Sequence, residues 1–275
     1  MKVKLLAKTQ NMLDVVYTGA RTCYNAGSPI DMWFDVCTIA TDKKKNLIDK
    51  VFKSGHLSTS EHAYFTFAIE GISRACSHQL VRHRHCSFSQ QSQRYVEIKE
   101  DIGELCHLLL ELQRDAKNKL DKTVATFEKT EELLNKYFVI EHVIPETMEA
   151  YLNDLITYKR YIEMGYKAED ARAVLPNATK TNIVVSMNLR ELIHLCNERL
   201  CTRAQGEIRQ LVKEMVAQVL ENEEWLKPYL VPKCEQNVIC FDNKSCVSKP
   251  TLEDLKQKWH DAGYEGGYND AKNKG

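Results

Sequence analysis

Residues 82–95 read RHRHCSFSQQSQRY and hold three arginines, two histidines and three serines. The preceding stretch, SRACSHQLV at 73–81, places Cys76, Leu80 and Val81 where they can pack inward, whereas Arg74, His78, Gln79 and Arg82 project elsewhere. Removing a guanidinium group from water is costly unless its charge is paired. The chain therefore delivers a dense polar cluster directly from a packed element, and we expect this cluster to hold an anionic, phosphorylated ligand.

The neighbouring segments alternate between strand-like and helix-like patterns. In residues 63–72, AYFTFAIEGI, side-chain character alternates along the chain and aromatic residues are frequent, which is typical of a strand. The stretch 41–56 predicts a helix with Thr41 as its N-cap and Gly55 as its left-handed end. Further strands are expected over 2–7 and 181–188. Further helices are expected from Thr9 to about Ala20, over the charge-laced stretch 104–138, over 146–163, and in a segment that ends at Pro176.

The composition indicates a globular protein without a bias toward polyanionic partners. The 275 residues are 43% hydrophobic, and 38 basic side chains balance 38 acidic ones. A net charge of zero argues against a nucleic-acid-binding protein, although basic, polar and aromatic residues do alternate in 82–95 as they do in single-strand binders. No run is long and apolar enough for a membrane span, and the apolar core of the N-terminal segment MKVKLLAKTQ is too short for a secretory signal. We expect a cytoplasmic protein that binds neither membrane nor nucleic acid.

Ten cysteines are present, and most are scattered without a framework spacing, which is typical of reduced thiols in a cytosol. Cys234, Cys240 and Cys246 recur at intervals of six, and with His260 they could complete a zinc site. Their spacing lacks the C-x2-C knuckle that usually brings two thiolates to one metal. The favoured interpretation is a cysteine-rich C-terminal loop without metal, followed by a mobile tail at 261–275.

A helix is predicted to begin after Asn188, whose side chain is a good N-cap and forms a capping-box pattern with Glu191. At 100° per residue, Arg190, His194 and Asn197 share the face opposite to the core. This face is either solvated or part of a site. Arg199 lies at the edge of the apolar stripe, where it needs an ion pair or a ligand anion. Polar functions on opposed faces favour a subunit interface with a site on each side. The core face comprises Leu189, Leu192, Ile193, Cys196 and Leu200.

Four ordered motifs resemble those of the flavin-dependent thymidylate synthases. Arg82, His83 and Arg84, followed after seven residues by Ser92, match the RHR-x7-S signature of that family. The segments GHLSTSEH at 55–62, ARAVLP at 171–176 and NLRELIHLCNER at 188–199 resemble its other motifs in the same order. The match covers roughly residues 1–100 and 145–215. It implies an α+β fold with a mainly antiparallel sheet flanked by helices.

The resemblance also implies a reaction and its cofactors. Members of this family methylate deoxyuridylate (dUMP) to thymidylate (dTMP), using FAD as the flavin, methylenetetrahydrofolate as the carbon donor and NADPH as the reductant of FAD. They assemble as homotetramers whose sites are built from several subunits. No glycine-rich dinucleotide fingerprint occurs in this sequence, so FAD would not be held in the Rossmann manner.

Residue roles follow from the same resemblance. Ser92 has no evident base partner and is interpreted as a hydrogen-bond donor, and Cys86 as a nucleophile is the less favoured alternative. Arg199 would face the pyrimidine and favour its ionised form, which activates the carbon to be methylated. The positions matching FAD contacts are His56, Ser58, Arg82, His83, Arg84, Gln90, Asn188, Leu189, Arg190 and His194. The positions matching dUMP contacts are Gln79, Leu80, Val81, Arg82, Gln90, Gln91, Ser92, Gln93, Arg94, Arg172 and Arg199.

Two parts of the chain fall outside the resemblance. The stretch 101–144 is expected to be a helical insertion in a catalytic domain that spans 1–225, and 226–275 to be a C-terminal extension. Peripheral helices and loops of this kind can reshape the entrance for folate or NADPH. A flavoprotein that binds nucleotide but performs another reduction is the remaining alternative.

Overall fold

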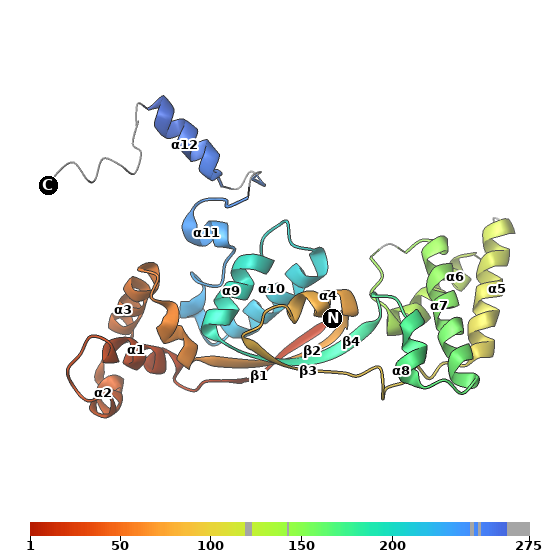
Figure 1. Cartoon of the computed structure of the whole chain (residues 1–275), viewed down its shortest axis with the longest axis horizontal. Helices are drawn as coiled ribbons and strands as arrows, with labels where there is room; N and C mark the ends of the chain where they lie inside the picture. The colour runs from red at the N-terminus through yellow and green to blue at the C-terminus, as the bar shows by residue number, and fades with distance from the viewer. Residues whose placement is uncertain (119–122, 142, 243–244, 247–248, 263–275) are drawn as a thin grey trace. The chain divides into compact units, whose positions relative to one another are not determined.

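The structure is a computed structural model that describes residues 1–262 except 119–122, 142, 243–244 and 247–248. A four-stranded antiparallel sheet in the order β1-β2-β4-β3 runs through it (Figure 1). The predicted α+β fold is confirmed, as are the three predicted strands. The strands are β1 (Lys2–Lys8), β2 (Tyr64–Ser73), β3 (Cys86–Gln90) and β4 (Lys180–Asn188).

The two central strands, β2 and β4, are buried at every second residue, as a pleated strand with one covered face requires. Between the buried positions, Thr66 Oγ1 lies 2.9 Å from Ser186 Oγ, so that a hydroxyl pair links the two strands. Such a cross-strand pair helps to set the register. The buried positions include Phe65, Phe67 and Ile69 of β2 and Ile183, Val185 and Met187 of β4.

The fourth strand, β3, is not predicted from the sequence. Its residues, CSFSQ, contain a single large apolar side chain, and none of the five is fully buried. It lies at the edge of the sheet beside β4. An edge strand faces water along one side and therefore tolerates serine and glutamine, so hydrophobic periodicity does not reveal it.

The chain divides into two compact units, each described here by itself. The first comprises Met1–Ala7 and Thr66–Ser186, and the second comprises Lys8–Phe65 and the described residues from Met187 onward. Besides most of the sheet, the first unit holds a helical group with its own core, which buries Leu105, Leu134 and Leu152 (Figure 1). Its helices are α4 (Arg74–Leu80), α5 (Ile102–Asn118), α6 (Thr123–Tyr137), α7 (Pro145–Glu163) and α8 (Ala168–Ala171).

The prediction of one long helix over 104–138 is wrong, because this stretch forms the two helices α5 and α6. α5 ends at Asn118 and α6 begins at Thr123; residues 119–122 lie outside the described residues, and the sequence there holds no glycine or proline. The two helices pack against each other and both pack against α7. Because α6 packs back against α5, leucines of both helices enter one core with α7. This burial depends on tertiary packing, which the spacing of apolar residues along the chain does not predict. The helix predicted over 146–163 is confirmed as α7.

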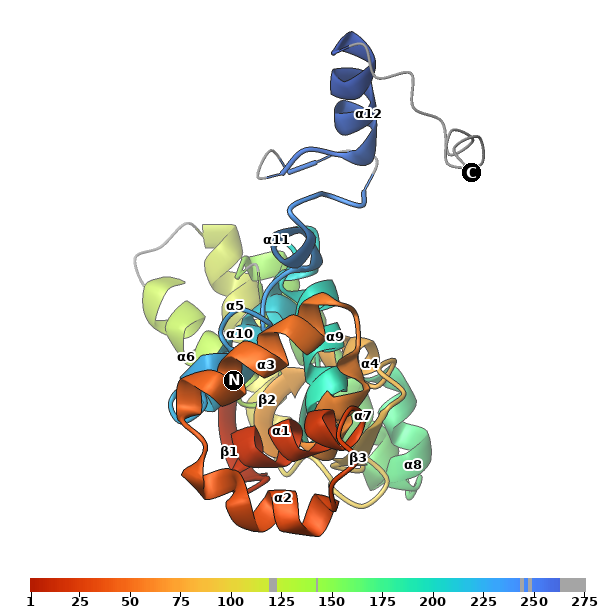
Figure 2. The ribbon, with the colours of Figure 1, turned by 90° about the vertical axis from the view of Figure 1, so that its left-hand side faces the viewer.

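In the second unit, α1 packs against α3, and α9 packs against α10 and α11 (Figure 2). The buried side chain of Lys44 donates to Asp14 Oδ1 at 2.6 Å, which pairs its charge between α1 and α3. The helices are α1 (Met12–Thr22), α2 (Pro29–Asp35), α3 (Thr41–Lys53), α9 (Leu189–Arg199), α10 (Gly206–Leu220), α11 (Lys233–Asn237) and α12 (Leu252–Asp261). Single 3₁₀ turns occupy Val36–Thr38, Leu57–His62 and Glu224–Leu226, and Arg172–Val174 in the first unit.

Three helix boundaries differ from the prediction. Thr9 does not start a helix, because its N–H donates to Tyr64 O at 3.0 Å and its hydroxyl accepts from Tyr64 N–H at 2.9 Å. This strand-like pairing delays α1 until Met12. Thr41 is the first residue of α3 and not its N-cap, whereas Gly55 has the predicted left-handed conformation with φ of 82°. The segment predicted to end at Pro176 contains only α8 and a 3₁₀ turn.

The C-terminal region is not a plain loop, since it forms α11 and α12. Thr251 caps α12 with a capping box, in which its hydroxyl accepts from Asp254 N–H and the Asp254 carboxylate accepts from Thr251 N–H. The predicted mobile tail at 261–275 lies, from residue 263 onward, outside the described residues. No helix in the described part of the chain is long and apolar enough to cross a membrane.

The core shared by α5, α6 and α7 yields a stability prediction. Leu134 is fully buried there, so Leu134→Ala should lower the free energy of unfolding by about 2–5 kcal/mol through lost burial and a residual cavity. Leu110→Ala is the matched control, because Leu110 on α5 is 65% exposed. Urea denaturation followed by circular dichroism compares the two variants. Equal losses of stability would contradict the shared core.

Candidate active site

The RHR-x7-S signature, residues 82–92, follows α4 and contains β3. The Ser73 hydroxyl caps α4 by accepting from Cys76 N–H at 2.9 Å, and the tight turn after α4 has His83 N–H donating to Leu80 O at 3.1 Å. His83 is buried, whereas Arg82 and Arg84 on either side of it are exposed. A buried histidine thus anchors a turn that holds two guanidinium groups toward solvent, where they can receive an anionic ligand.

One residue of the packed element that precedes the signature differs from the expectation. Leu80 is fully buried, as predicted, but Val81 is 38% exposed. Val81 follows the last residue of α4, where the chain turns, so its side chain no longer lies on the inward face of the helix. The prediction that Val81 packs inward is therefore wrong. Its exposure does leave it able to contact a ligand.

Gln90 is held inside the first unit. Its side-chain amide donates to Ser77 Oγ at 2.9 Å and to Thr181 Oγ1 at 3.2 Å. These bonds tie β3 to α4 and β4, and Ser77 and Thr181 are both buried. An unpaired buried hydroxyl is costly, so Gln90 has a structural role in addition to the binding role predicted for it.

The next three predicted residues, Gln91, Ser92 and Gln93, line a cavity of about 450 Å³ in the first unit. Asn182 of β4 organises one wall: its carbonyl accepts from Gln91 N–H at 2.9 Å, and its side-chain oxygen accepts from Gly71 N–H at 3.0 Å. The volume lies within the range of small-ligand sites. The structure therefore brings the end of the RHR-x7-S signature, Gln91 and Ser92, to the wall of one cavity together with Gln93. The other lining residues include Glu70, Val96, Glu97, Ile98, Lys136, Tyr137, Tyr158, Leu175 and Lys180.

Burial shifts the pKa values of three ionisable side chains that line this cavity. Burial, together with the hydrogen bond to Glu100, raises the pKa of the Tyr137 phenol, and burial raises the pKa of Tyr158. Burial also lowers the pKa of Lys180. Both phenols therefore keep their protons at neutral pH. The Tyr137 hydroxyl donates its hydrogen bond to Glu100, so its oxygen can only accept a hydrogen bond from a ligand.

Arg94 and Arg172 both contact Glu169 in the first unit, and Arg74 lies close enough to Arg172 to be affected by its charge. Arg94 Nε lies 2.7 Å from Glu169 Oε2, and Arg172 Nε donates to Glu169 O at 3.1 Å. Burial, and then the charge of Arg172, lower the pKa of Arg74. Of these three arginines, only Arg94 is paired here with the Glu169 carboxylate, so the like charges of Arg172 and Arg74 favour a bound anion such as a phosphate. The structure thus brings predicted Arg94 and Arg172 together.

Arg74 was not predicted as a site residue. It is the first residue of α4, where the positive end of the helix dipole disfavours a cation. An arginine at that position, directly after the N-cap Ser73, was the available signal. Its proximity to Arg172 is a tertiary fact, because α4 and the 3₁₀ turn at 172–174 are distant in sequence.

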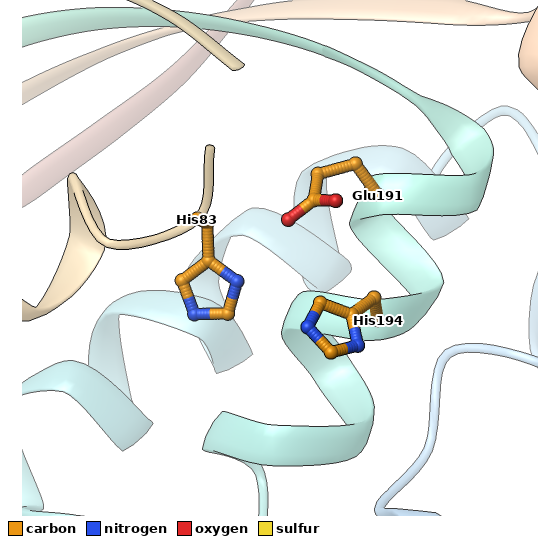
Figure 3. Close-up of side chains that lie close together, drawn as sticks. All are labelled: His83, Glu191 and His194. Atoms are coloured by element: carbon orange, nitrogen blue, oxygen red, sulfur yellow. The ribbon is translucent and has the colours of Figure 1, made fainter. Parts of the chain in front are cut away.

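In the second unit, α9 has a buried apolar face and an exposed polar face, as predicted. The Asn188 side chain caps the helix by accepting from Glu191 N–H at 2.9 Å. Arg190 and His194 are exposed, and Arg190 pairs with Glu61. Figure 3 shows His194 projecting from α9 close to the carboxylate of Glu191. Glu191 is buried, which the helical spacing of apolar residues did not predict. The predicted core face is confirmed, with Leu189, Leu192, Ile193 and Cys196 buried and Leu200 half-buried.

The remaining predicted residues of the second unit lie at two places. His56 and Ser58 are exposed in the turn after α3, and His56 lines a depression of about 260 Å³ with Arg21, Tyr24 and Lys50. Arg199 is half-buried in the last turn of α9 and lines a cavity of about 340 Å³. The predicted flavin contacts are thus divided between the units: Arg82, His83, Arg84 and Gln90 belong to the first, and the others to the second.

Comparison with known proteins identifies the family. The sequence model described as "Thymidylate synthase complementing protein" matches residues 4–222. The flavin-dependent thymidylate synthase of Nitratidesulfovibrio vulgaris is 39% identical over 260 residues, which cover 92% of this chain and 97% of that protein. The chain belongs to the flavin-dependent thymidylate synthases. A further member, from Geobacter sulfurreducens, is 41% identical over 216 residues, covering 78% of this chain and 81% of its own.

A solved flavin-dependent thymidylate synthase shares the fold. The crystal structure of ThyX from Helicobacter pylori, complexed with FAD and dUMP, matches with a TM-score of 0.61 and covers 82% of this chain and 97% of that one. Sequence identity between the two is 24%, so this likeness carries the fold alone. The predicted family and its flavin-dependent enzyme class are confirmed by the sequence matches.

Substitution of Gln90, which is hydrogen-bonded inside the unit, and of Gln91, which lines the cavity, should affect stability differently. Gln90→Ala should lower the free energy of unfolding by about 1–3 kcal/mol, because the buried Thr181 hydroxyl loses the hydrogen bond from Gln90 and the Ser77 hydroxyl keeps only its bond to Arg74 O. Gln91→Ala, at an exposed position, should change it by less than about 0.5 kcal/mol. Thermal unfolding measures both. A stable Gln90→Ala variant would refute the structural role.

Proposed function

We propose that this chain is a thymidylate synthase that methylates dUMP to dTMP, with FAD as its bound cofactor and with methylenetetrahydrofolate and NADPH as co-substrates. The observation that carries the proposal is the family membership of a chain in which Ser92, the last residue of the RHR-x7-S signature, lines a cavity of about 450 Å³. The FAD and dUMP in the complex from Helicobacter pylori add support from a protein of the same fold.

The first unit offers a suitable site for dUMP. Its phosphate would bind near Arg94 and Arg172, where Arg74 adds positive charge. Guanidinium groups suit this task because two parallel N–H donors match two phosphate oxygens. The ring and sugar would contact the short polar side chains of the cavity wall. The proposed contacts are Gln79, Leu80, Val81, Arg82, Gln90, Gln91, Ser92, Gln93, Arg94 and Arg172, together with Arg199.

The residues proposed to hold FAD fit a dinucleotide. Arg82 and Arg84 flank the buried His83 and supply positive charge for the diphosphate. The depression at His56, with Arg21, Lys50 and Tyr24, combines two further cations with an aromatic side chain. Bound and reduced FAD supplies the hydride. The remaining proposed contacts are Ser58, Gln90, Asn188, Leu189, Arg190 and His194.

Arg199 is the residue proposed to activate the uracil ring. It lies in the last turn of α9, where the negative end of the helix dipole stabilises its positive charge. A guanidinium group beside N3 and a carbonyl oxygen favours the ionised ring and raises electron density at the carbon that receives the methyl group. No protein nucleophile is required, so Ser92 and Cys86 have no covalent role in this proposal.

The assembly and location are also part of the proposal. A homotetramer with sites shared between subunits would use the exposed polar face of α9, where Arg190 and His194 lie. Residues 1–225 would form the catalytic domain, with a helical insertion at 101–144 and a C-terminal extension at 226–275. A cytoplasmic location is supported by the ten cysteines, all of them among the described residues and none in a disulfide.

The visible absorption spectrum of the purified protein, before and after addition of dUMP, tests the proposal. Flavin bands that shift with the nucleotide are expected. Arg199→Ala should retain FAD and its bands but lose at least about 100-fold in the rate of thymidylate formation, because one charge that stabilises the reacting ring is removed. A colourless protein that does not take up added FAD would overturn the proposal. Thymidylate formation at the normal rate by Arg199→Ala would overturn the role of that arginine.

Arg172 yields a separate prediction about the phosphate. Arg172→Ala should weaken dUMP binding by about 10–100-fold, which corresponds to the loss of one charge-assisted interaction, while FAD content stays unchanged. Arg114→Ala is the matched control, since Arg114 is an exposed arginine on α5 that pairs with Asp115. Titration of flavin fluorescence with dUMP measures both variants. Equal affinities would show that Arg172 does not bind the phosphate.

A further inference from the structure

Four of the ten cysteines gather around one cavity of the second unit. Cys201 follows α9, Cys234 lies on α11, and Cys240 and Cys246 lie between α11 and α12. All four line the cavity of about 340 Å³, and Cys234 interacts electrostatically with each of the other three. Tertiary structure thus adds Cys201 to the three cysteines that recur at intervals of six. His260 lies on the exposed part of α12 and does not line this cavity.

Contacts that do not involve the thiol groups hold these segments together. Asn197 Nδ2 of α9 donates to Val231 O at 3.1 Å, ahead of α11, and Arg203 Nη1 lies 3.2 Å from Asp242 Oδ2. Cys240 N–H donates to Pro250 O at 2.8 Å. The four cysteines are therefore positioned by the local fold of the second unit, and their grouping has a structural basis.

The segment that carries three of these cysteines has little apolar core. Val238 is 66% exposed and Phe241 is 57% exposed, whereas Cys240 is buried. Small elements that cannot bury enough apolar surface are commonly stabilised by a disulfide or a metal ion. None of the four cysteines is joined in a disulfide. A metal ion is the cross-link that matches four reduced thiols.

Three cationic side chains line the same cavity. Arg199, Arg203 and Lys233 line it together with the four cysteines. Nearby cations stabilise thiolates, and four thiolates with one divalent ion would carry a net charge of −2, which Lys233 can partly offset, whereas Arg203 already pairs with Asp242. Four sulfur ligands in tetrahedral arrangement are the preferred environment of a structural zinc ion.

We propose that Cys201, Cys234, Cys240 and Cys246 bind one zinc ion, which joins the C-terminal segment to the end of α9. The thiol protons pass to solvent as the zinc–sulfur bonds form, and no oxidation state changes. Within the described residues, no three of these sulfur atoms lie within 4.8 Å of one another. Zinc–sulfur bonds of about 2.3 Å require closer sulfur atoms, so binding draws the segment inward.

Metal analysis of the full-length, untagged protein, purified anaerobically from zinc-supplemented medium, tests this inference. About one zinc ion per chain is expected. Cobalt should replace zinc and produce the visible absorption of a tetrahedral thiolate complex. Absence of both metals after supplementation would overturn the proposal. A disulfide between any two of the four cysteines, found by mass spectrometry of the anaerobic sample, would also overturn it.

Single substitutions locate the metal. Cys234→Ser and Cys246→Ser should each weaken zinc binding by at least about 100-fold in competition with a chromogenic chelator, since each removes one of four ligands. Cys246 is exposed, so Cys246→Ser leaves the core intact if Cys240→Ser fails to fold. Cys23→Ser and Cys37→Ser, at exposed sites outside the cavity, are matched controls that should keep the metal. Full zinc retention by Cys234→Ser and Cys246→Ser would refute the site. FAD content, measured on the same samples, reports separately on the proposed function.

Discussion

The pairing of β2 with β4 is the constraint on which the rest of the structure depends. Both strands bury alternate side chains, and a shift of one residue would expose Phe67 and Val185 to water. β2 continues directly into the cap of α4, and β4 continues directly into the cap of α9. The starts of both site-bearing helices are therefore set by strands whose register is determined by burial and by the hydroxyl pair of Thr66 and Ser186.

Positive charge without matching negative charge marks the proposed nucleotide site. Arg94 pairs with the Glu169 carboxylate, Arg172 donates only to the Glu169 backbone carbonyl, and burial followed by the like charge of Arg172 lowers the pKa of Arg74. The chain as a whole is neutral, so this excess is local. A protein maintains such a cluster where an anion offsets the repulsion.

Sequence patterns predicted most elements but missed those that depend on distant partners. The strands at 2–7, 63–72 and 181–188 follow from alternation, and the faces of α9 follow from helical spacing. β3 escaped prediction because an edge strand tolerates polar residues, and the break between α5 and α6 because only packing against α7 makes it favourable. Arg74 and Glu191 were missed because their surroundings come from other segments.

The sequence by itself determined the family, the order of the motifs and the types of most elements, because these properties reside in residue identity and local spacing. Only the tertiary structure decided that Gln91, Ser92 and Gln93 share a cavity wall with Tyr137, and that Cys201 joins Cys234, Cys240 and Cys246. The physical reason is the same in both cases. Each grouping requires segments that are distant in the chain to be held together by packing and hydrogen bonds, and local periodicity carries no information about such partners.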